Sequence, residues 1–104
     1  MEPRVVDNPE QSRFEIYAGE SAAELAGFAE YHLHGEEIAF IHTEIDPRFG
    51  GQGLGGKLAQ AALDEVRARG LRVLPYCPFI RGWIRKHPEY VDLVPMQHRE
   101  KFEL

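Results

Sequence analysis

The stretch GGQGLGGK, residues 50–57, holds five of the ten glycines in this 104-residue chain. A glycine inside a helix or strand costs roughly 0.5–1 kcal/mol relative to alanine, so this cluster indicates a backbone that something approaches closely. Three templates fit the letters. The glycines at 51, 53 and 56 match the dinucleotide pattern G-x-G-x-x-G, and residues 51–57 match most of a P-loop, G-x-x-x-x-G-K. The third template uses the glycines at 50, 53 and 55, and the surrounding sequence must decide among the three.

The sequence before this glycine loop (residues 50–57) predicts strands. Residues 13–18, 24–33 and 37–45 are the three segments, and apolar and polar residues alternate along the first two. Because only short turns separate them, they form an antiparallel meander. Residues 1–12 are polar and contain Pro3 and Pro9, which predicts a flexible arm in front of the domain.

After the glycine loop the period changes. Apolar residues at positions 58, 59, 62, 63 and 66 predict an amphipathic helix that ends at Gly70. Residues 71–76 form a fourth strand, which is parallel to the third because a helix joins the two. Residues 78–87 form a second helix, 91–94 a short final strand and 97–104 a frayed, charged end. The predicted domain therefore spans residues 13–94, followed by a charged tail over 95–104.

This order of elements argues against two of the templates. A P-loop needs serine or threonine after its lysine to hold magnesium, and Leu58 stands there. A dinucleotide-binding fold needs several βαβ units and an acidic residue at the end of the next strand. Here the next strand ends in Tyr76 and Cys77, and a meander precedes the loop.

Composition points to one soluble globular domain, with 43% apolar and 28% charged residues. The net charge of -5 argues against nucleic acid as a partner and mildly favours a cationic one. Cys77 is the only cysteine, so an internal disulfide is impossible and a cytoplasmic location is expected. The sequence contains no run of about 18 apolar residues, so no membrane span is expected.

The remaining template resembles the loop of the GNAT acetyltransferases, Arg/Gln-x-x-Gly-x-Gly/Ala, which opens a helix after an antiparallel meander. Residues 50–55 fill that frame. The chain is most similar to the short single-domain members, at HTEI (residues 42–45), GQGLGGKLAQAAL (residues 51–63) and CPF (residues 77–79). It departs from the family at the first loop position, which is Gly50, and it lacks the two helices that long members insert after the first strand.

The resemblance implies a reduced GNAT fold of the α+β class and an N-acetyltransferase that uses acetyl-CoA and no metal. The acceptor would be a primary amine on a small molecule or a peptide, and a monomer is expected. The alternative is a non-catalytic acyl-CoA-binding or protein-interaction module on the same fold. Coenzyme A would be bound by the backbone near Thr43, Glu44 and Ile45 and by the loop residues Gly50, Gly51, Gln52, Gly53, Leu54, Gly55, Gly56 and Lys57.

Three residues are candidates for catalysis. Cys77 precedes the second helix, and in the family this end of the strand lies close to the acetyl thioester; Cys77 either accepts the acetyl group or lines the pocket. Glu44 and His42 share one face of the third strand, and either one is a candidate base for the attacking amine. Arg81 and Arg85 share a face of the second helix and are candidates for the phosphates, or a solvated basic face.

Overall fold

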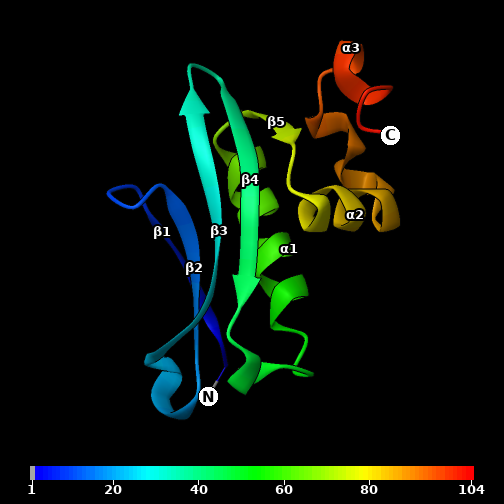
Figure 1. The fold of residues 1–104 in the computed structure, drawn as a ribbon. Helices are drawn as coiled ribbons and strands as arrows, with labels where there is room; N and C mark the ends of the chain where they lie inside the picture. Colours follow the sequence, from blue (N-terminus) through cyan, green and yellow to red (C-terminus); the bar gives the residue numbers. More distant parts are fainter. Residues whose placement is uncertain (1) are drawn as a thin grey trace.

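The fold is a five-stranded sheet with helices on one side. The computed structural model describes residues 2–104 (Figure 1). The strands are β1 (Arg4–Asn8), β2 (Arg13–Ala18), β3 (Glu24–His34), β4 (Glu37–Ile45) and β5 (Arg72–Pro75). The helices are α1 (Leu54–Ala68), α2 (Pro78–Lys86) and α3 (Met96–Arg99), and 3-10 turns cover Glu20–Ala22, Pro47–Phe49 and Pro88–Leu93.

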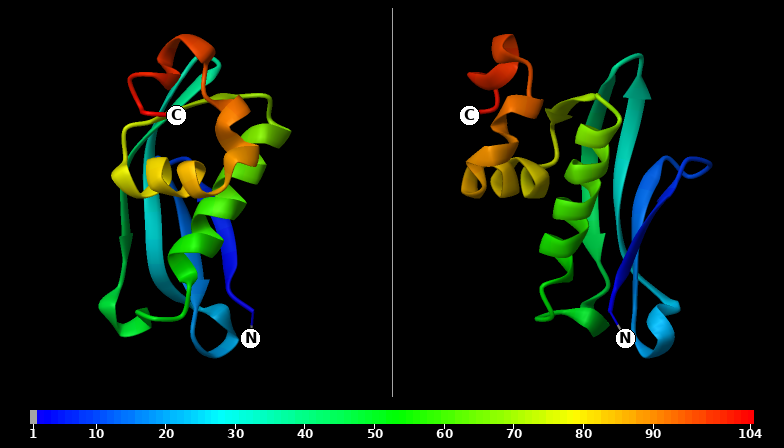
Figure 2. Two further views of the ribbon diagram at one scale, coloured as in Figure 1. Left: turned by 90° about the vertical axis from the view of Figure 1, so that its right-hand side faces the viewer. Right: turned by 180° about the vertical axis from the view of Figure 1, so that it is seen from behind.

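The sheet has the order β1-β2-β3-β4-β5, and its first four strands are antiparallel. The last strand, β5, is parallel to β4, and α1 connects the two. This arrangement confirms the predicted α+β class and the parallel pairing after the meander. Figure 2 shows α1 and α2 on the same side of the sheet. We call the opposite side of the sheet the outer face.

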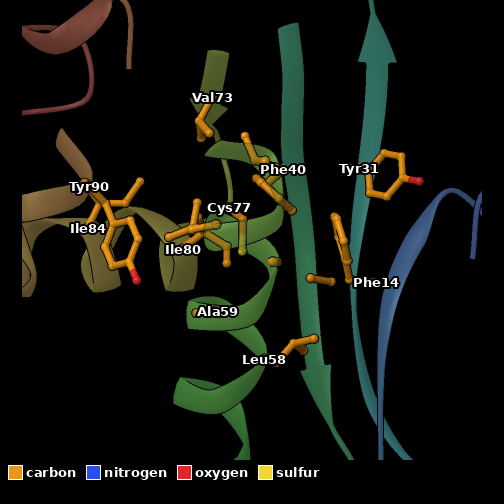
Figure 3. Close-up of a cluster of buried hydrophobic side chains, with 14 of the residues drawn as sticks. Phe14, Tyr31, Phe40, Leu58, Ala59, Val73, Cys77, Ile80, Ile84 and Tyr90 are labelled. Carbon is orange, nitrogen blue, oxygen red and sulfur yellow. The ribbon is translucent and has the colours of Figure 1, made fainter. Parts of the chain in front are cut away.

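The core lies between the sheet and the two longer helices. Phe14 of β2, Phe40 of β4, Leu58 of α1 and Ile80 of α2 are each at most 2% exposed (Figure 3). The predicted apolar stripe of α1 is the buried one, and Leu54 extends it by one turn toward the N-terminus. Within residues 2–104, no helix combines the length and the apolar character needed to cross a membrane.

The predicted flexible arm contains a strand instead. Its first residue, Met1, lies outside the described residues, but β1 pairs with β2 along its whole length. Val5 packs against the core, and the Asp7 carboxylate accepts a 2.6 Å hydrogen bond from the Tyr31 hydroxyl and pairs with Arg69 at 2.9 Å. Burial, reinforced by the bond to Asp7, raises the pKa of Tyr31 to about 12.

The C-terminal end also differs from the prediction. Residues 91–94 fall in and just after a 3-10 turn rather than in a strand, and an ion pair between Arg67 and Asp92 joins that turn to α1. The tail is not frayed, because the Phe102 ring is 1% exposed and meets the Tyr76 ring edge-on at 5.1 Å. Both ends of the chain therefore pack on the same core as the residues between them.

Candidate active site

The glycine loop leads from the end of β4 into α1. Gly51 and Gly53 have φ angles of +80° and +72°, in the left-handed region where glycine is favoured. Gly53 is the N-cap of α1, and in residues 2–104 no side chain caps this helix. Its first turn also contains no acidic residue. The first backbone N–H groups of a 15-residue helix are thus left for an external acceptor, and the helix dipole favours an anion there.

Gly55 and Gly56 have a different structural role, which is to allow close packing. A Cβ atom at Gly55 would lie 2.9 Å from the Phe79 ring, and one at Gly56 would lie 2.8 Å from the Trp83 ring. Real Cβ atoms do not come this close to carbon, so the absence of side chains at 55 and 56 lets α2 pack against the first turn of α1. Lys57 is exposed in that turn and lines a surface hollow together with Gln52 and Gly19.

One edge of β4 is free beyond its middle. Pairing with β5 ends at Phe40, whose carbonyl accepts a 2.8 Å bond from the Cys77 N–H, after which the chain turns into α2. The pairing with β3 skips Ile41, which is a one-residue bulge. After the bulge the Asp46 N–H donates to Ala26 of β3, at 2.7 Å.

The bulge determines which backbone groups face the free edge. In a regular strand, the backbone groups of Phe40 and Asp46 would point to the same side, because the two residues are an even number of positions apart. Here the Phe40 carbonyl faces β5, whereas the Asp46 N–H faces β3. Because alternate residues of a strand face alternate sides, His42 and Glu44 direct their backbone groups toward β3. The backbone groups of Thr43 and Ile45 then point to the free edge, where the resemblance places the pantetheine arm.

Cys77 lies at the start of α2 as predicted. It is the N-cap residue, it is 2% exposed, and it packs between β4 and α2 near Phe40 and Ile80 (Figure 3). Its sulfur lies 3.2 Å from the hydroxyl oxygen of Thr43, and either group can donate the proton. The thiol and a hydroxyl therefore meet at the point where β4 and β5 part.

His42 and Glu44 lie on the outer face of β4. The His42 Nε2 atom is 3.0 Å from the Glu44 Oε1 atom, and the two side chains are 54% and 60% exposed. The structure thus joins these two candidates to each other, and it separates them from Cys77, which lies with Thr43 on the helix side. Candidates from both sides of the sheet therefore flank the part of β4 that lies beyond its pairing with β5.

A polar cluster continues from these residues across the outer face. The Phe28 ring lies 6.2 Å from the His42 ring, and the Arg13 guanidinium lies 4.6 Å from the Phe28 ring. Glu15 is 3% exposed and accepts hydrogen bonds from Arg13 and Tyr17. Burial alone raises the pKa of Glu15, but its hydrogen bonds outweigh burial and lower the pKa overall.

The structure does not bring Arg81 and Arg85 to the glycine loop. At 100° per residue, both lie on the side of α2 opposite Phe79, and Arg85 donates to the Phe102 carbonyl at 3.4 Å. Their contact with phosphates remains a prediction. Lys86, which follows Phe79 by seven residues and shares its side of α2, lines a small hollow of about 170 Å³ with Phe79 and Trp83.

Two features of the site were missed from the sequence. The Thr43 hydroxyl was not a candidate, because 34 residues separate it from Cys77 and no local pattern joins them. Lys86 was not a candidate either, although its seven-residue spacing from Phe79 places both residues on the same side of α2. Within residues 2–104, no three His, Cys, Asp or Glu side chains are grouped so as to hold a metal ion.

Comparisons with known proteins identify the family and support the fold. The profile of the GCN5-related N-acetyl-transferase family matches residues 13–93, so the chain belongs to that family. No curated protein matches the sequence. The fold is similar to that of a GCN5-like protein from Staphylococcus aureus, solved by NMR, with a TM-score of 0.65 and 26% identity over 88% of this chain and 87% of that one.

Two further structures share the fold over part of their length. The ribosomal-protein-S18-alanine N-acetyltransferase of Escherichia coli has a TM-score of 0.54 and 25% identity, over 61% of this chain and 39% of that one. Ard1 of Thermoplasma volcanium has a TM-score of 0.52 and 24% identity, over 66% of this chain and 45% of that one. The similarity to Ard1 concerns the fold alone.

Proposed function

We propose that this chain transfers the acetyl group of acetyl-CoA directly to a primary amine. The observation that carries the proposal is the N-terminus of α1, which among the described residues has no side-chain cap and no acidic first turn, and which follows the part of β4 that β5 leaves unpaired. A pyrophosphate fits the helix N-terminus, where backbone N–H groups and the dipole favour negative charge. The amide groups of a pantetheine arm fit the free backbone of Thr43 and Ile45, which continue the sheet's hydrogen bonding.

The reaction itself needs a base. An alkyl ammonium has a pKa of about 10.4, and only the neutral amine attacks. Glu44 takes the first proton of the ammonium, directly or through water, and His42 at 3.0 Å is positioned to share it. As the nitrogen–carbon bond forms and the carbon–sulfur bond breaks, a second proton passes from the nitrogen to the sulfur, so coenzyme A leaves as a thiol.

Cys77 lines the acetyl site in this scheme and does not carry the acetyl group. A ternary complex of acetyl-CoA and amine needs no second acyl site in so small a domain. The Thr43 hydroxyl, 3.2 Å from the Cys77 sulfur, holds the thiol in place at the point where β4 and β5 part.

A second function is favoured by one observation. His42 and Glu44 are more than half exposed on an outer face that carries no helix within residues 2–104, so water reaches the proposed base freely. Such a site suits a protein that binds an acyl-CoA without turning it over.

Thioester turnover distinguishes the two functions. Purified protein is mixed with acetyl-CoA and a panel of primary amines, and free thiol is measured over time. Catalysis predicts amine-dependent thiol release, whereas a binding module gives tight acetyl-CoA binding in calorimetry and no release. Tight magnesium-dependent binding of ATP, with none of acetyl-CoA, would overturn both.

A further inference from the structure

A surface hollow beside Glu44 points to the kind of amine that is acetylated. It has a volume of about 530 Å³, within the range of about 300–1,000 Å³ that is usual for small-molecule sites. Four consecutive residues of β3, 25–28, form one side, and four from the end of β4 and the following turn, 44–47, form the other.

Six of the eight lining residues are apolar, and the two acidic ones alternate with them along the end of β4. Leu25 is 38% exposed and is not part of the core, and the half-buried Phe28 ring lies near it in the sequence. Ile45 and Pro47 add apolar surface from the other side. Leu25 and Phe28 thus give the hollow an apolar surface that a hydrocarbon chain can cover.

The acidic residues of the lining come from β4 and the residue that follows it, and they carry negative charge. Glu44 and Asp46 are the two carboxylates of the lining, and within residues 2–104 no lysine or arginine lines the hollow. Arg48 pairs with Asp46 at 3.2 Å and offsets its charge. Within residues 2–104, Glu44 forms no ion pair with a lysine or an arginine, and its side-chain partner is His42, so it is the carboxylate left to meet a cation.

We propose that this hollow is the acceptor site and that its substrate class is a primary amine on an uncharged, apolar chain. The inference rests on the proposed function, because Glu44 is the base there. The ammonium group lies at Glu44, which takes its proton, and the hydrocarbon chain covers Leu25 and Phe28. A second ammonium group on the chain would fall on apolar surface, or beside Asp46, whose charge Arg48 already offsets, and would lose its hydration.

A series of straight-chain amines tests the substrate class. Methylamine to hexylamine all carry the same reacting group, so kcat/KM reports only the added methylenes. We expect kcat/KM to rise about two- to fourfold per methylene, the upper value being the factor for a fully buried CH₂ at about 0.8 kcal/mol. We expect 1,6-diaminohexane to react at least tenfold less well than hexylamine. A flat series, or a preference for the diamine or for a lysine peptide, would overturn the inference.

Matched variants locate the site. Leu25→Ser should flatten the chain-length dependence and lower kcat/KM for hexylamine about tenfold. Leu33→Ser is the control, because Leu33 is also exposed, at 56%, but lies near the far end of β3 outside the hollow. An equal effect of both variants would contradict the assignment.

A binding measurement separates this inference from the proposed function. Hexylammonium is titrated into ¹⁵N-labelled protein, and the amide shifts of residues 25–28 are followed. Saturable shifts there, lost in Leu25→Ser, support the site even if no amine is turned over, in which case the proposed catalysis fails and the amine site stands. Turnover of amines with no shift at residues 25–28 would overturn the site and leave the catalysis intact.

Discussion

The conformation of Gly53 allows the proposed phosphate site to be tested without disturbing the core. Its φ angle is +72°, and an added Cβ would meet nothing within 4 Å among the described residues. Substitution therefore costs only backbone energy, about 1–2 kcal/mol for alanine and less for asparagine, which adopts this region more readily. At about 4–8 °C per kcal/mol for a domain of this size, Gly53→Ala should lower Tm by about 4–16 °C, and Gly53→Asn by less.

The same substitutions should damage binding far more than folding. The new side chain enters the open space in front of the first N–H groups of α1, where the pyrophosphate is proposed to lie. Losing one charge-assisted hydrogen bond costs about 1.5–3 kcal/mol, which corresponds to a roughly 10- to 150-fold weaker Kd for coenzyme A. Thermal melts without ligand give the first quantity, and titration calorimetry with coenzyme A gives the second.

Gly70 provides the matched control. It lies just beyond the other end of α1 with a φ angle of +71°, and a Cβ there also meets nothing within 4 Å in the described part of the chain. Gly70→Asn should therefore lower Tm about as much as Gly53→Asn and leave the Kd for coenzyme A unchanged. If Gly53→Asn is folded and binds coenzyme A as tightly as the unaltered protein, the loop is purely structural and the phosphate site lies elsewhere.

Four other outcomes follow from the structure. Glu44→Gln should lower turnover roughly 10²–10⁴-fold, with partial recovery at high pH where more amine is neutral, and acetyl-CoA affinity in calorimetry should change little. Cys77→Ala should lower turnover modestly, and mass spectrometry after incubation with acetyl-CoA alone should find no acetyl on Cys77; a stoichiometric adduct that amine removes at the catalytic rate would contradict direct transfer. Tyr31 has a pKa raised to about 12 from 10.0, so the stability linked to its proton, about 3 kcal/mol, is complete below pH 10 and is lost between pH 10 and 12; urea unfolding across this range should show a shallower loss for Tyr31→Phe. Phe102→Ala should lower the free energy of unfolding by about 3–5 kcal/mol in urea titrations, whereas a frayed tail predicts no change.

The sequence was most informative where a local period or a local turn determines the structure. Strands β2 and β4 have the predicted bounds, because each is flanked by turn residues, and the burial of α1 follows its three- and four-residue spacing. Strand β1 was missed because its support comes from Tyr31 and Arg69, which are distant in the sequence. Phe102 was missed for a similar reason, since a single apolar residue in a charged segment has no period.

The site, like the fold, could be predicted only where nearby residues determine the structure. The glycine loop could be recognised from its letters, but the contacts that distinguish its glycines could not. Gly53 is required by its own backbone angle, whereas Gly56 is required by a Trp83 ring 27 positions away. The bulge at Ile41 has no sequence signal at all, yet it decides which backbone groups of β4 are free.

That bulge has an evolutionary consequence for the length of β4. Phe40 pairs with Tyr31 and His42 pairs with Glu30, so Ile41 is the residue that the pairing leaves out. Deleting Ile41 would leave a regular ladder in which Thr43 stays beside Cys77 and His42 and Glu44 stay on the outer face. A one-residue deletion within residues 42–45 would instead move every later residue of the strand to the opposite face. Changes of length should therefore be tolerated at position 41 and purged from residues 42–45. In comparisons of related chains, the spacing from His42 to the glycine loop should be a better marker of a working site than the spacing from Phe40.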